Sequence, residues 1–206
     1  MRLNEQNSES GDDGAPAHGT THGRNWALPG DRRRVIMIGK GRKPLRGEAR
    51  TMAHVQDAAA YILDRLGPMS AMKLQKLCYF SYGYHLAWEE RQLFPERFEA
   101  WANGPVSPRL YASHRGLFGV RPGDIKGDAG KLDDGERESI DLVLGSYGGF
   151  TAHQLSAMTH REGPWVLARR RAGAAELERS SEELDDDEIF EFFDALTSAD
   201  NNGREE

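Results

Sequence analysis

Thr159, His160 and Glu162 form the polar cluster whose residue types and spacing best fit acid–base chemistry. A histidine close to a glutamate can act as a general base that the carboxylate orients. No nucleophile or second acid lies near them in the sequence, so folding would have to supply one. The alternative is a buried His160 that hydrogen-bonds a carboxylate or carbonyl and fixes the turn into Pro164 and Trp165. We favour this structural interpretation and expect no catalytic residue.

Cys78 is the only cysteine and stands in an apolar pattern. A buried cysteine usually behaves as a small hydrophobic residue, so we favour packing over nucleophilic catalysis. A single cysteine forms no internal disulfide, which fits a reducing compartment.

Lys73 and Lys76 flank Gln75 in an otherwise apolar segment. If that segment is buried, the ammonium groups must reach solvent, a helix cap or an acidic partner. We predict an ion pair between one of these lysines and Glu99 or Glu162, with a structural pair favoured over a binding contact.

Three aromatic residues lie near prolines and open two interpretations. Trp101, Tyr111 and Trp165, beside Pro105 and Pro164, can form a groove that binds a peptide. They can equally attach an extended segment to the helices. The sequence does not decide between these alternatives.

Several other chemistries find no support in the sequence. Gly39-Lys40-Gly41 lacks the spacing and the preceding strand of a phosphate loop. The chain has one cysteine and therefore no Cys-x-x-Cys pair, and we expect neither a metal nor a cofactor.

The charge pattern gives no strong indication of nucleic acid or membrane as a partner. The 206 residues carry a net charge of -6, and no long apolar run is present. Basic stretches at 32–50 and 169–171 are interpreted as solvated, although DNA binding through 32–50 or pairing of 169–171 with the acidic run 182–188 are alternatives. We expect a cytoplasmic protein.

Hydrophobic periodicity predicts a mainly α-helical fold with a small extended insertion. The second helix is apolar all round, so it should be the central, buried one. The prediction places an extended segment at 94–106 and a surface loop at 116–130. The predicted helices cover 52–66, 70–88, a short segment from 107, 133–147, 151–159, 164–171 and 180–196. Ser70, Ser107, Asp133 with Glu136, Thr151 with Gln154, and Ser180 with Glu183 are the expected caps.

The chain divides into three predicted parts. Residues 1–51 are polar, glycine-rich and then basic, which predicts a disordered extension. Residues 52–197 form one compact helical domain, and 198–206 a frayed tail. A misassigned start codon is another explanation for residues 1–51.

Three segments of the chain together form a specific pattern. They are Met72-Lys73-Leu74-Gln75-Lys76-Leu77 with Tyr79 and Tyr82; Glu99-Ala100-Trp101 with Gly104-Pro105-Val106; and Leu155-Ser156 with Thr159-His160, Glu162 and Pro164-Trp165. In their order and spacing they resemble the Panacea domain, the family of SocA-like antitoxins that also includes phage-associated GepA-like proteins. One departure is Tyr84-His85, where the family more often has Trp-His.

The resemblance implies an antitoxin that binds and neutralises a cognate toxin encoded by an adjacent gene. A proteolytic adaptor that delivers the toxin to an ATP-dependent protease is one alternative, and a hydrolase or transferase using His160 and Glu162 is another. Residues 1–51 would help to choose the toxin. The shared positions that we assign to partner binding are Lys73, Gln75, Lys76, Tyr79, Glu99, Trp101, Gly104, Pro105, Val106, Thr159, His160, Glu162, Pro164 and Trp165.

Overall fold

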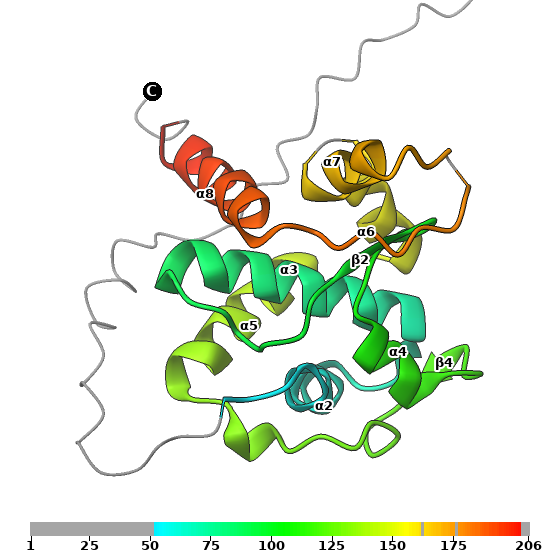
Figure 1. Cartoon of the computed structure of the whole chain (residues 1–206). Coiled ribbons are helices and arrows are strands. Elements are labelled where there is room, and N and C mark those ends of the chain that lie inside the picture. Colours follow the sequence, from blue (N-terminus) through cyan, green and yellow to red (C-terminus); the bar gives the residue numbers. More distant parts are fainter. Residues whose placement is uncertain (1–51, 162, 176, 203–206) are drawn as a thin grey trace, which may run out of the picture.

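A computed structural model describes residues 52–161, 163–175 and 177–202 (Figure 1). The predicted extension 1–51, Glu162 and residues 203–206 lie outside the described residues. Over the described residues the protein is mainly helical and contains two small two-stranded sheets. This confirms the predicted fold class.

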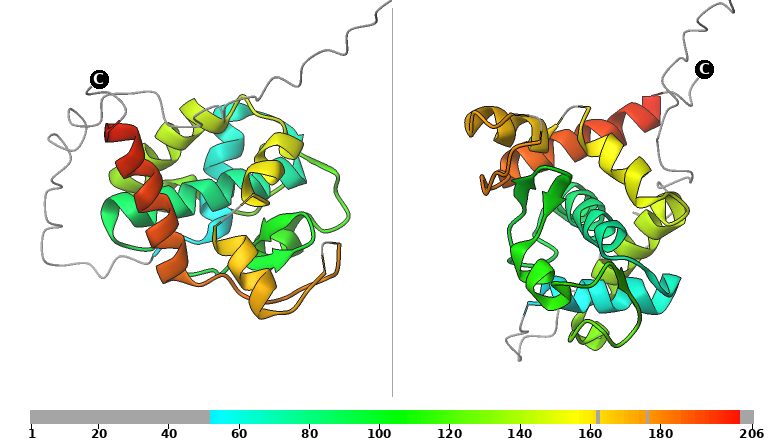
Figure 2. Two further views of the ribbon diagram at one scale, coloured as in Figure 1. Left: turned by 90° about the horizontal axis from the view of Figure 1, so that it is seen from above. Right: turned by 90° about the vertical axis from the view of Figure 1, so that its right-hand side faces the viewer.

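Helix α3 (Ala71–Glu89) runs through the centre of the molecule, as its all-round apolar pattern predicts. It packs against α2 (Val55–Leu66), α5 (Asp134–Tyr147), α6 (Ala152–Thr159) and α8 (Asp186–Asn202), which surround it in the views of Figures 1 and 2. The helix begins at Ser70, whose hydroxyl accepts a hydrogen bond from the Lys73 N–H at 3.2 Å. This cap is the one predicted.

Aromatic packing joins α3 to α5 and α8. The Tyr84 and Tyr147 hydroxyls lie 2.7 Å apart and satisfy one another, while Phe80 stacks on Tyr147 at 4.8 Å between ring centroids. A Cβ at Gly83 would lie 2.2 Å from the Phe193 ring, so the close approach of α8 to α3 depends on glycine at this position.

The start signals of most other helices are confirmed. Asp133 and Glu136 form a reciprocal capping box on α5, and Thr151 and Gln154 form one on α6. α4 (Pro108–His114) and α7 (Pro164–Arg171) begin with proline, which suits a first helical position that needs no N–H. Ser107 occupies the N-cap of α4, but its hydroxyl makes no capping bond, contrary to the prediction.

Two extended elements accompany the helices. β2 (Glu99–Trp101) and β3 (Gly104–Val106) pair antiparallel within the predicted extended segment, with Ala100 opposite Pro105. β1 (Met69–Ser70) pairs with β4 (Gly119–Val120). The predicted loop 116–130 is therefore only partly correct: it contains β4 and the start of the 3₁₀ helix η1 (Ala129–Lys131), because Val120 and Ile125 are buried in the core.

The last helix begins later than predicted. Ser180 and Glu183 do not cap it; α8 starts at Asp186, and the Asp185 carboxylate accepts hydrogen bonds from the N–H groups of Asp187 and Glu188. Residues 182–184 instead run beside β2, where the Ala100 N–H donates to the Glu182 carbonyl at 2.8 Å. Leu184 is buried there, and burying it competes with an earlier helix start. α8 also extends to Asn202, beyond the expected boundary at 197.

Candidate functional site

Two polar residues of α3 from the shared segments, Gln75 and Lys76, make hydrogen bonds to the β2–β3 hairpin and to the residue after it. Lys76 Nζ donates to the Pro105 carbonyl at 2.8 Å. Gln75 brackets Ser107: its Oε1 accepts from the Ser107 N–H at 3.0 Å, and its Nε2 donates to the Ser107 carbonyl at 3.4 Å. The same Nε2 lies 3.0 Å from His114 Nε2, so His114 accepts there as a neutral ring.

Side chains of α6 and α7 hold the same hairpin from the other side. Trp165 Nε1 donates to the Trp101 carbonyl at 2.9 Å, and Arg169 Nη1 donates to the Ala100 carbonyl at 2.9 Å. The Ser156 hydroxyl donates to the Asn103 carbonyl at 2.8 Å. A short hairpin is marginal on its own, and these bonds to its carbonyls fix its position.

Gly104 turns the hairpin in a space that admits no side chain. Its φ is +97°, a conformation that favours glycine. A Cβ there would lie 2.6 Å from Thr159 Oγ1 and 2.8 Å from Lys76 Nζ. The hairpin, α3 and α6 therefore meet at this one residue.

The predicted lysine–glutamate pair is wrong for Glu99. Lys73 Nζ donates to the Gly148 carbonyl at 2.7 Å, Lys76 binds the hairpin, and Glu99 Oε2 accepts from Trp101 Nε1 at 2.7 Å. Glu162, the other predicted acid, lies outside the described residues. Lys76 is 1% exposed, and burial lowers its pKa to about 7.

The residues considered for catalysis are engaged in packing. The His160 ring stacks on Trp165 at 4.0 Å with 6° between the planes, at the turn into α7. The Thr159 hydroxyl donates to the Ser156 carbonyl at 2.8 Å. Cys78 is fully buried, and burial raises the pKa of its thiol, which disfavours the nucleophilic thiolate. Tyr79 packs edge-on against Phe98 at 5.3 Å.

A groove of about 600 Å³ opens on the outer side of the hairpin. Gln75 and Lys76 contribute to its lining from α3, and Trp101 and Tyr111 meet edge to face at 4.8 Å beside it. Of the three aromatic residues considered for a groove, Trp101 and Tyr111 therefore line one. Trp165, Pro105 and Pro164 do not line it, because Trp165 serves as the attachment that the alternative interpretation described.

Large apolar side chains stand exposed at the groove. Phe118 is 91% exposed, Leu177 is 82% exposed and Leu117 is 47% exposed, and all three line it. Arg179 lies with its guanidinium 5.9 Å from the centre of the Trp101 ring. Exposed apolar clusters of this kind commonly mark contacts with other proteins. Sequence analysis missed these residues, although Leu117-Phe118 between two glycines was an available signal.

Comparison with known proteins agrees with the resemblance drawn from the sequence. The family model for the antitoxin SocA-like, Panacea domain matches residues 74–166. The chain is 35% identical over 138 residues to antitoxin SocA of Caulobacter vibrioides (strain NA1000 / CB15N), an alignment that covers 61% of this chain and 72% of that protein. The chain belongs to the SocA-like antitoxin family. No solved structure matches it.

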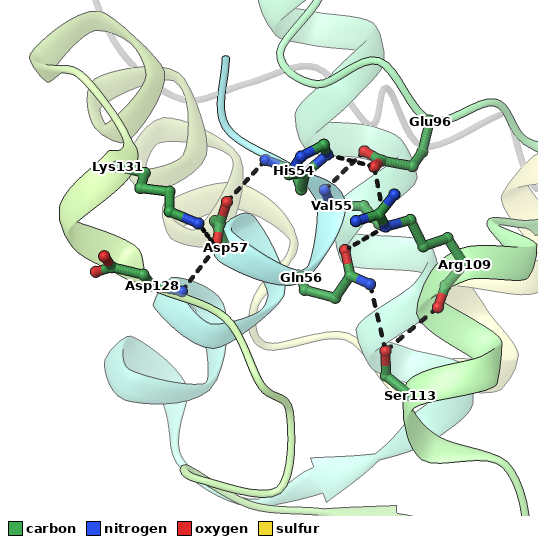
Figure 3. A network of polar contacts seen from close by, with 9 residues as sticks. All are labelled: His54, Val55, Gln56, Asp57, Glu96, Arg109, Ser113, Asp128 and Lys131. Atoms are coloured by element: carbon green, nitrogen blue, oxygen red, sulfur yellow. Dashed lines mark hydrogen bonds and ion pairs between the residues drawn. The ribbon is translucent and has the colours of Figure 1, made fainter. Parts of the chain in front are cut away.

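A second polar cluster of this SocA-like protein lies at the start of α2 (Figure 3). His54 Nδ1 lies 2.6 Å from Glu96 Oε1, and Glu96 Oε2 accepts from the Val55 N–H at 2.9 Å. Arg109 Nε lies 3.2 Å from Glu96 Oε1. Ser113 is no nucleophile for this histidine, because its hydroxyl donates to the Arg109 carbonyl.

This second cluster fixes the beginning of the described domain. Asp57 accepts from the His54 N–H at 2.8 Å and from the Asp128 N–H at 2.7 Å, and Lys131 Nζ lies 3.6 Å from it. Carboxylates at a helix N-terminus satisfy free N–H groups and complement the helix dipole. Sequence analysis did not find this cluster.

The described part of this SocA-like protein offers no group of three or more His, Cys, Asp or Glu side chains placed to hold a metal ion. Among the same residues, no helix has the length and apolar character needed to cross a membrane.

Proposed function

We propose that the protein is an antitoxin that neutralises a cognate toxin protein by binding it through the groove beside Trp101. Membership of the SocA-like family and the similarity to antitoxin SocA support the antitoxin role. The observation that carries the binding mode is the exposure of Phe118, Leu177 and Leu117 around one groove. An apolar surface of this kind gains stability when a partner covers it.

The same site argues against an enzyme. Among the described residues, the polar side chains nearest the hairpin donate to backbone carbonyls instead of facing one another as an acid, a base and a nucleophile. The buried thiol of Cys78 and the stacked ring of His160 give no support to a hydrolase or transferase. We therefore assign a binding function to this surface.

Co-expression tests the proposal. The product of the neighbouring gene is the assigned toxin; induced alone in a bacterial host it should stop growth, and the full-length protein should restore growth. Phe118→Ser combined with Leu177→Ser should abolish rescue and pull-down of the toxin. Leu66→Ser combined with Leu167→Ser is the matched control, because these leucines are each 40% exposed and do not line the groove. Full rescue by the groove variant would contradict the proposed binding site.

Two further experiments test whether the protein acts as a proteolytic adaptor and whether residues 1–51 select the toxin. A proteolytic adaptor would shorten the half-life of the toxin, whereas binding alone leaves the half-life unchanged. If residues 1–51 select the toxin, deleting them should abolish rescue while residues 52–206 remain folded by circular dichroism. Unchanged rescue by residues 52–206 would exclude that role for the extension.

A further inference from the structure

The lining of the groove has an unbalanced charge. Its basic side chains are Lys76, His114 and Arg179, and no aspartate or glutamate is present among the described lining residues. The whole chain has a net charge of -6, so a lining without acids departs from the average surface. His114 adds no charge, because burial lowers its pKa and it accepts a hydrogen bond from Gln75 as a neutral ring.

Arg179 differs from Arg171 and Arg97 in its partners. Arg171 pairs with Glu182 and Glu188, and Arg97 lies 2.9 Å from Asp186. Arg179 is exposed and makes no ion pair with a described carboxylate; its guanidinium faces the Trp101 ring. A planar guanidinium held beside an aromatic ring keeps its donors available for a carboxylate.

Lys76 lies at the base of the groove, where its lowered pKa of about 7 leaves the amine partly protonated near neutral pH. Its one hydrogen bond among the described residues goes to the Pro105 carbonyl, and an ammonium group has three protons to donate. The side chain is 1% exposed and no described acid pairs with it. A carboxylate brought into the groove would favour the protonated, charged form of this amine.

The apolar rim lies around these two basic side chains. Phe118 and Leu177 are the two most exposed large hydrophobic side chains of the described residues, and both line the groove with Arg179. The indole N–H of Trp101 is already bonded to Glu99, so Trp101 offers its ring and not a donor. The surface therefore presents apolar contacts and positive charge together.

We propose that the groove receives an extended segment of the partner protein in which a large apolar side chain packs against Phe118 and Leu177 and an acidic side chain is directed toward Arg179 and Lys76. This inference rests on the proposed function, since the segment belongs to the toxin that the protein neutralises. Charge complementarity selects the occupant, because an uncharged or basic segment supplies no counter-ion to Arg179 or to the protonated form of Lys76.

Selection of peptides tests the inference without knowledge of the toxin. A phage library of random twelve-residue peptides is selected on the immobilised full-length protein, and enriched sequences should combine Asp or Glu with Phe, Trp or Leu. One enriched peptide is then synthesised with an amidated C-terminus, so that only side-chain acids carry negative charge. Its affinity is measured by fluorescence anisotropy.

The expected changes are specific to the groove. Arg179→Glu, or replacement of the peptide's acids by Asn or Gln, should weaken binding about 10-fold. Phe118→Ser should weaken it to a similar extent. Arg170→Glu is the matched control, because Arg170 is exposed and does not line the groove, and it should leave the affinity unchanged.

Other outcomes overturn the inference. Enrichment without acidic residues, equal affinity for Arg179→Glu, or no enrichment at all would each exclude an acidic, apolar occupant. Growth rescue by the wild-type protein is measured in parallel. If rescue persists, only the inference on the bound segment fails; if the wild-type protein does not rescue growth, the proposed function fails, whatever the peptides show.

Discussion

The inner and outer sides of the β2–β3 hairpin use their side chains for different purposes. On the inner side, Ser156, Arg169 and Trp165 are buried and donate hydrogen bonds to hairpin carbonyls. On the outer side, Phe118 and Leu177 are exposed. The inner residues stabilise the fold, whereas the outer residues gain only if something covers them. Many residues of the segments shared with the family thus stabilise the fold. The exposed residues of the groove, Phe118 and Leu177, lie outside those segments.

The largest expected effect is on Arg169, at the centre of the inner side. It donates to the carbonyls of Ala100, Ala175 and Glu178 and is 5% exposed. Arg169→Met should lower the free energy of unfolding by about 3 kcal/mol or more, because three carbonyls lose a charged donor. Urea denaturation measures this. Arg170→Met is the control, because Arg170 is exposed. An equal loss of unfolding free energy in both variants would show that the bonds from Arg169 to the three carbonyls do not stabilise the fold.

The second largest loss of stability is expected at Gly104, because the hairpin contacts both α3 and α6 at this residue. Gly104→Ala combines an unfavourable φ with a collision against Thr159 and Lys76, and should lower the free energy of unfolding by about 2–3 kcal/mol. Gly116 also has a positive φ, of +86°, but nothing lies within 4 Å of its Cβ position. Gly116→Ala should therefore cost about 1 kcal/mol, and equal costs would show that the collision is relieved.

Lys76 should make stability depend on pH. Its pKa is lowered to about 7 in the folded state from an ordinary 10.5, so the unfolded chain binds the extra proton between these values. Stability therefore rises with pH across that window, by about 2 kcal/mol between pH 7.5 and 9.5 for this group. Lys76→Met should remove that increment in urea denaturation at the two pH values. An unchanged increment would mean that Lys76 keeps an ordinary pKa.

The smallest effect on stability should come from the outer side. Phe118→Ser should change the free energy of unfolding by less than about 0.5 kcal/mol, because the ring is 91% exposed. Its effect on toxin neutralisation should nevertheless be large. A thermal unfolding curve paired with the growth assay checks both, and a strong loss of stability would show that Phe118 belongs to the core.

Local signals explain which elements could be predicted. The caps at Ser70, Asp133 and Thr151 act over three residues, so the sequence shows them directly. Apolar residues all round α3 likewise predict a central, buried helix. The prediction failed at Ser180 and in the 116–130 loop, where Leu184 and Val120 are buried by contacts with distant segments.

From the amino-acid sequence we could predict the mainly helical fold, most helix starts, the extended insertion and the family. Three long-range contacts became evident only in the folded molecule. Lys76 binds the Pro105 carbonyl and not Glu99, and Trp165 bonds to the hairpin. Phe118, Leu177 and Arg179 line one groove. Helix caps and periodicity depend on neighbours a few residues apart, whereas these contacts join positions tens of residues apart. Their geometry exists only once the central helix has brought those segments together.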